Sequence, residues 1–98
     1  MNIEIIANGS ELTIKLTGRM DTTTAPKLEA ELKQNIGGVE KLVLDFAALE
    51  YVSSAGLRVI LTAQDIMDEQ GAMKVVHAND AVLEILDITG LVDLLTIE

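Results

Sequence analysis

The sequence predicts an α/β fold with a mixed central sheet, an opening β-hairpin and helices packed on the sheet, in the order β-β-α-β-α-β-α-β. Three observations predict it. Apolar and polar residues alternate from Glu11 to Thr17, which is the period of a half-buried strand. Later extended segments are separated by stretches with apolar residues at helical spacing. The 98 residues suit one core, and we expect a single domain over residues 1–98 with right-handed crossovers.

The first half of the chain predicts a hairpin, a helix and a strand. Asn8-Gly9 tolerates positive φ and joins strands at Ile3 to Ala7 and Glu11 to Thr17. The cluster Asp21-Thr22-Thr23-Thr24 offers caps for a helix with Pro26 in its first turn. This helix ends at Gly37-Gly38 and has apolar residues at Ala25, Leu28, Leu32 and Ile36. Lys41 to Phe46 follows as a strand, and its run Leu42-Val43-Leu44 is typical of a central strand covered on both faces.

The second half predicts two further helices and two strands. Ser53-Ser54 stands at the N-cap of a helix that ends at Gly71, with an apolar stripe at Val59, Ile60, Ala63, Ile66 and Met67. Met73 to His77 predicts a strand. Asn79 or Asp80 caps a third helix, which carries Val82, Ile85 and Leu86 and closes at Thr89-Gly90. A last extended segment is expected around Val92 to Leu95.

Composition excludes several classes of function. A formal charge of −9 repels nucleic acid, and the chain has only two aromatic residues for base stacking. No apolar run approaches the roughly 20 residues of a membrane-spanning helix, and the first residues lack an export signal, so we expect a cytoplasmic protein without membrane insertion. Without cysteine and with one histidine, a transition-metal site is disfavoured. We expect no cofactor.

The sequence around the paired serines argues against an enzyme. A catalytic serine needs a base and an oxyanion hole, and Val52-Ser53-Ser54-Ala55-Gly56-Leu57 lacks the glycine pattern of the hydrolase elbow. His77, at a predicted strand end, is interpreted as a satisfied or solvated histidine. A hydroxyl at a helix start has two other uses: it can cap the free N–H groups of the first turn, or it can stand exposed as a phosphoryl acceptor. These two roles are compatible.

The segment Tyr51-Val52-Ser53-Ser54-Ala55-Gly56-Leu57-Arg58, preceded by Leu42-Val43-Leu44-Asp45, resembles the signature of STAS domains, in particular of bacterial anti-sigma factor antagonists. The likeness extends to the opening hairpin, to Leu16-Thr17-Gly18-Arg19-Met20-Asp21 and to Ile88-Thr89-Gly90-Leu91. The resemblance implies partner switching: the unmodified protein binds an anti-sigma factor that is also a serine kinase, phosphorylation releases it, and a serine phosphatase restores it.

The resemblance also implies roles for individual residues. Ser54 matches the phosphorylated serine. Ser53 takes the place of an aspartate, and its hydroxyl is a second, less favoured acceptor. Asp21 matches an aspartate close to the phosphorylation site, with a turn or cap carboxylate as the equal alternative. The implied partner-binding set is Asp21, Ser53, Ser54, Ala55 and Gly56. Asp45 matches a polar strand-end position, where a bond to the neighbouring backbone and contact with a partner are equal alternatives. Gly56 is expected to permit close packing, and Leu57 is expected to join the core.

A second interpretation keeps the STAS fold without the switch. STAS domains also serve as subunits of lipid-transport complexes and stress-sensing particles, in which the serine is only a cap. We expect the free protein to be a monomer. The acidic residues Asp65, Asp68 and Glu69 of the second helix are interpreted as a solvated face.

Overall fold

The computed structural model describes residues 1–98 and contains the predicted elements in the predicted order up to the third helix. The elements are β1 (Asn2–Asn8), β2 (Glu11–Met20), α1 (Ala25–Asn35), β3 (Lys41–Val52), α2 (Ser54–Gln70), β4 (Ala72–Val76), α3 (Asp80–Ile88) and the 3-10 helix η1 (Leu91–Asp93). The mixed α/β fold predicted from the sequence is confirmed.

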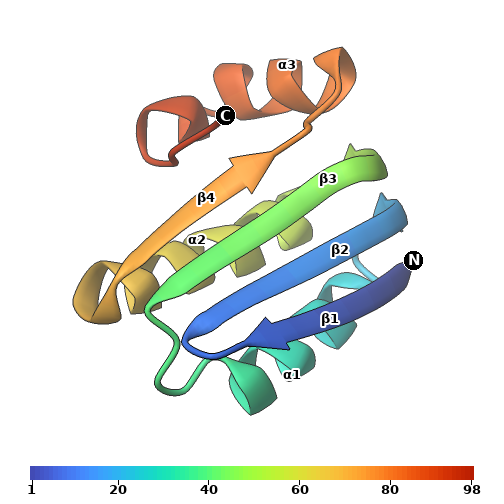
Figure 1. Ribbon diagram of the computed structural model, residues 1–98. Helices are drawn as coiled ribbons and strands as arrows, with labels where there is room; N and C mark the ends of the chain where they lie inside the picture. Colours follow the sequence, from blue (N-terminus) through green and yellow to red (C-terminus); the bar gives the residue numbers. More distant parts are fainter.

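The four strands form one sheet in the order β1-β2-β3-β4. β1 and β2 pair antiparallel, whereas β2–β3 and β3–β4 pair in parallel, so α1 and α2 are the two crossover helices. Figure 1 shows α1 and α2 on the same face of the sheet and α3 beyond β4. The other face of the sheet carries no helix (Figure 1).

The opening hairpin has a two-residue loop at Gly9-Ser10, closed by the pair Asn8 and Glu11. Gly9 has φ +63°, and Ser10 is not among the residues with positive φ. Positive φ at the first central residue alone defines a type II′ turn, which favours glycine there. The hairpin was predicted correctly, although Asn8 belongs to the strand and the turn is one residue later.

The core lies between the sheet and its helices and contains 25 buried apolar residues but no buried charged side chain. Leu42 and Leu44 of β3 are fully buried in it. Val43 points to the helix-free face, where its pairing partners are Thr13 and Lys74. The strand is central and buried on both faces, as expected, but helices cover only one of these faces. Neighbouring side chains shield Val43 instead.

β3 is much longer than the predicted strand, because it continues from Phe46 to Val52 beside β2. Its register against β2 shifts twice, between Lys15 and Thr17 and between Gly18 and Arg19. The residues that face the core are accordingly two positions apart up to Phe46, and then three positions apart at Leu49 and Val52. This change of period explains why the segment did not indicate a strand.

The chain after α3 also differs from the expectation of an extended segment around Val92 to Leu95. Leu91–Asp93 is a 3-10 helix that follows Gly90 at φ +79°. Leu91 and Leu95 are four residues apart and both buried, which a helical turn allows because it places them on one side. Extended pairing comes later, where Ile97 bridges Val75 in parallel.

Candidate functional site

The site lies where β2 and β3 end side by side. Met20 and Val52 are the last paired residues of the two strands. The Ser53 N–H donates a hydrogen bond of 2.8 Å to the Met20 carbonyl. Asp21 and the paired serines therefore leave the sheet at adjacent points, which brings together residues more than 30 positions apart in the sequence.

Ser53 is the N-cap of α2. Its backbone is extended, with φ −85° and ψ 173°, and its Oγ accepts a hydrogen bond of 3.3 Å from the Gly56 N–H. The side chain is half-buried. The predicted capping role thus belongs to Ser53.

Ser54 is the first residue of α2 and is exposed to solvent. The hydroxyl of Ser54 makes no hydrogen bond within the chain, whereas that of Ser53 is engaged with the helix. The free N–H groups and the positive end of the helix dipole lie at the same turn, and both favour an anion there. Ser54 therefore offers a free oxygen in surroundings that tolerate added negative charge.

Gly56 holds the start of α2 against the sheet. A Cβ at this position would lie 2.7 Å from Met20 Sδ, 2.9 Å from Met20 Cγ and 3.0 Å from Val52 Cγ1. Only glycine allows this approach without a shift of the neighbours, as expected from the sequence. Gly56, which was predicted to bind a partner, is buried and can support such a surface only from below, while Ala55 beside it is half-buried and Leu57 joins the core.

Asp21 organises the turn before α1. Its Oδ1 accepts hydrogen bonds from the Thr23 N–H at 2.9 Å, the Thr24 N–H at 3.0 Å and the Thr24 hydroxyl at 3.2 Å. The Thr24 N–H and the other donors lower the pKa of Asp21 below its ordinary value of 3.8, against a smaller opposing effect of desolvation. The turn role is therefore present, and the half-buried carboxylate stays ionised at the rim of the site.

Two arginines border the site. The Arg19 guanidinium lies 4.4 Å from the centroid of the Tyr51 ring, its register partner on β3. Arg58 is exposed on α2, four residues after Ser54 and so on the same helix face. Neither arginine forms a salt bridge in the structure. The four-residue spacing could have indicated Arg58 from the sequence, whereas the Arg19–Tyr51 contact depends on a shifted register.

Asp45 does not belong to the site, because it lies within β3 rather than at its end. Its Oδ1 accepts from the Ala47 N–H at 2.9 Å and lies 3.1 Å from His77 Nδ1. Desolvation raises the pKa of Asp45, but the Ala47 N–H, the His77 contact and the charge of Lys15 together bring it below 3.8. His77 is an exposed histidine at a strand end, as interpreted from the sequence.

This fold and this pattern at the start of α2 are those of the STAS domain, whose family matches residues 2–98, and the chain belongs to that family. None of the helices combines the length and apolarity that crossing a membrane requires.

Among its relatives is BtrV of Bordetella bronchiseptica, named as an anti-sigma factor antagonist, which is 38% identical over 77 residues; the match covers 76% of this chain and 66% of BtrV. The anti-sigma-B factor antagonist of Bacillus subtilis is 24% identical over 98 residues, covering 99% of this chain and 90% of the relative. These relatives are named as regulators rather than as enzymes.

Solved structures agree on the fold. The anti-sigma factor antagonist SpoIIAA in its unphosphorylated form superposes with a TM-score of 0.85 at 17% identity, over 99% of this chain and 88% of SpoIIAA. The phosphorylated form of SpoIIAA from Bacillus gives a TM-score of 0.77 at 16% identity, over 99% and 91%. At this level of identity the likeness establishes the STAS fold.

Proposed function

We propose that the protein is a cytoplasmic anti-sigma factor antagonist that binds an anti-sigma factor with serine kinase activity and is switched off by phosphorylation of Ser54. The observation that carries this proposal is the division of roles between two adjacent serines. The Ser53 hydroxyl caps α2 by accepting a hydrogen bond from the Gly56 N–H. The Ser54 hydroxyl is exposed and makes no hydrogen bond to the rest of the chain. The names of the relatives support the regulatory class.

A phosphate on Ser54 would be tolerated by the fold. It would add about −1.5 to −2 charges at neutral pH, next to the free N–H groups and dipole of α2. Arg58, four residues further along the helix, is within the spacing for a favourable side-chain pair. The free energy of unfolding is therefore expected to change little.

The same phosphate would oppose a partner. The proposed partner-binding surface consists of Asp21, Ser53, Ser54 and Ala55, supported from below by Gly56. A protein packed on this surface would have to accommodate the bulk of the phosphate and remove water from a near-dianion, on a chain that already carries −9. Binding is lost while the fold persists, and a serine phosphatase would restore the binding form.

The chemistry of phosphoryl transfer belongs to the partner in this proposal. A kinase supplies the nucleotide, the metal ions and the catalytic base, so the antagonist needs only an accessible hydroxyl and no cofactor. The imidazole of His77 forms its hydrogen bond with Asp45, and no base bonds to Ser54. This arrangement favours a phosphoryl acceptor over a serine hydrolase.

The test is to incubate the purified chain with the anti-sigma factor kinase and ATP and to measure intact mass. One phosphate is expected on the wild type and on Ser53→Ala, and none on Ser54→Ala. Ser53→Ala is the matched control, because it removes the neighbouring hydroxyl. A phosphate on Ser54→Ala would refute the assignment of Ser54 as the acceptor. If the wild type gains no phosphate although the kinase is active and binds it, the protein is better explained as a STAS subunit of a lipid-transport or stress-sensing assembly.

A further inference from the structure

β1 is the one strand of the sheet without a buried side chain, although it contains three isoleucines. Ile3 and Ile5 pack against the core but are only partly buried. Ile6, on the helix-free face, is 40% exposed. The strand lies at the edge of the sheet with β2 as its only strand neighbour (Figure 1). Apolar surface is therefore incompletely covered on both faces of this strand.

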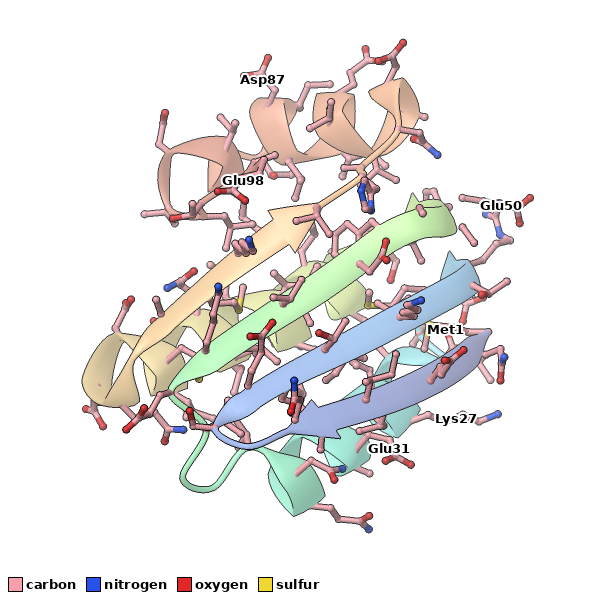
Figure 2. The ribbon with its side chains drawn as sticks, viewed as in Figure 1. Met1, Lys27, Glu31, Glu50, Asp87 and Glu98 are labelled. Carbon is pink, nitrogen blue, oxygen red and sulfur yellow. The ribbon has the colours of Figure 1, made fainter.

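The opposite edge of the sheet is covered. The Val75 N–H of β4 donates to the Thr96 carbonyl at 2.9 Å, and the Glu98 N–H donates to the Val75 carbonyl at 2.9 Å. Lys74 also pairs with Glu98 at 3.1 Å, and Figure 2 shows Glu98 beside β4. The final residues thus protect one edge strand from pairing with another chain.

The edge of β1 has few of the usual protections. Its seven residues contain no proline, lysine or arginine, and its pairing with β2 runs from Asn2 to Asn8 without a bulge. Glu4 is the only charged residue. Proteins usually blunt an exposed edge strand with such features, because its free N–H and C=O groups bind another strand.

The hairpin determines which backbone groups are free. A two-residue loop is closed by a hydrogen-bonded pair, here Asn8 and Glu11, and such pairs alternate along an antiparallel ladder. The backbone groups of Ile3, Ile5 and Ala7 therefore point away from β2. These are also the residues whose side chains face the helix side of the sheet.

We propose that two copies of this chain associate through antiparallel pairing of their β1 strands, about a two-fold axis at Ile5. In this register Ile5 faces Ile5 of the second copy and Ile3 faces Ala7, so all outward N–H and C=O groups of these residues are paired. Glu4 faces Ile6 rather than another glutamate. The partly buried isoleucines of the two copies meet on the helix side.

Charges on α1 fit the same symmetry. Lys27 and Glu31 lie one turn apart on this helix, and Figure 2 shows both on the side of the molecule where β1 forms the edge. The two-fold axis makes the two α1 helices antiparallel, so Lys27 of one copy lies on the side of Glu31 of the other copy. The two surfaces are therefore complementary in charge. Self-association is thus favoured over pairing with an unrelated strand.

The association is weak, because seven residues per strand bury less than the roughly 1,200–2,000 Å² of a standard stable interface. We expect a dissociation constant above about 10 μM. The monomer expected from the sequence then predominates at all concentrations below this dissociation constant. The proposal does not depend on Ser54, and Ser54→Ala is expected to dimerise like the wild type.

Sedimentation equilibrium up to millimolar concentration tests the pairing through position 6. Ile6→Lys is expected to tighten the dimer by about 2- to 30-fold, because in this register each lysine faces Glu4 of the other copy, and the opposite charges outweigh the usual effect of an edge lysine. Ile6→Glu is expected to weaken the dimer by a similar factor, because each new glutamate faces Glu4. Nonspecific adhesion through an exposed isoleucine would instead be weakened by both changes, and that result would overturn the proposal, as would a strictly monomeric wild type.

A single cysteine tests the register, since the chain has none of its own. With Ile5→Cys the two thiols lie on hydrogen-bonded neighbours with Cα atoms about 5.5 Å apart, which suits a disulfide. With Ile3→Cys, a matched change on the same face, the two Cα atoms lie about 14 Å apart. Mild oxidation should cross-link only the first variant. Equal cross-linking of both, with melting curves showing both folded, would overturn the register.

Discussion

The two adjacent serines should respond differently to the loss of their hydroxyls. Ser53→Ala removes the cap bond to the Gly56 N–H, a change that costs about 0.5–2 kcal/mol at typical N-caps. Because this bond is long, at 3.3 Å, we expect the lower half of that range, about 0.5–1 kcal/mol. For a domain of 98 residues this corresponds to a fall in Tm of about 2–8 °C.

Ser54→Ala should leave Tm nearly unchanged, since the hydroxyl is exposed and bonds to nothing in the chain. Ser54→Asp should raise the free energy of unfolding by about 0.3–1 kcal/mol through the helix dipole, and, if the proposed function holds, it should weaken the complex with the anti-sigma factor kinase. Thermal melting followed by circular dichroism measures all three variants. A Ser54→Ala protein that melts lower than Ser53→Ala would refute the assignment of cap and acceptor.

Three further predictions concern the fold that supports the site. Gly56→Ala should lower the free energy of unfolding, measured with urea, by about 1–3 kcal/mol, because the buried Met20 side chain must move away from the new methyl group. Gly71→Ala should lower the free energy of unfolding by more than about 4 kcal/mol or prevent folding, because its Cβ would lie 1.9 Å from the backbone carbonyl oxygen of Glu40. A Gly71→Ala protein that is as soluble as the wild type and melts cooperatively would contradict this. The folded-state pKa of Asp45 lies below 3.8, so its carboxylate stabilises the fold above about pH 4, and this contribution is lost as pH falls through the folded-state pKa. Urea midpoints measured down to about pH 2 should fall less steeply for Asp45→Asn than for the wild type.

Local patterns predicted most of the fold. The alternation of Leu12, Ile14 and Leu16 identified β2, and helical spacing identified α1, α2 and α3. Side-chain caps are present at the starts of α2 and α3, whereas the N-cap residue of α1 makes no side-chain cap hydrogen bond. The patterns failed where tertiary pairing changes the local period. In the second half of β3 the bulges move buried residues from a spacing of two to a spacing of three, so Leu49 and Val52 gave no strand signal.

The site could be predicted only in part. A helix start with two hydroxyls was visible at Ser53-Ser54, but which serine caps the helix depends on backbone geometry at Ser53. Asp21 lies near the paired serines only because β2 and β3 are neighbours in the sheet. This pairing joins residues far apart in the sequence, and local patterns do not predict it. Asp45 looked like part of the same strand end because the predicted strand was too short.

The attachment of α2 to the sheet limits how an enzyme can reach Ser54. The Ser53 N–H bonds to the Met20 carbonyl, and Gly56 seats the helix directly on Met20 and Val52. The segment therefore cannot be drawn as an extended peptide into a substrate groove without local melting. Under the proposed function, a kinase would therefore have to recognise the three-dimensional surface of the intact domain, and a synthetic peptide spanning this helix start would make a poor substrate.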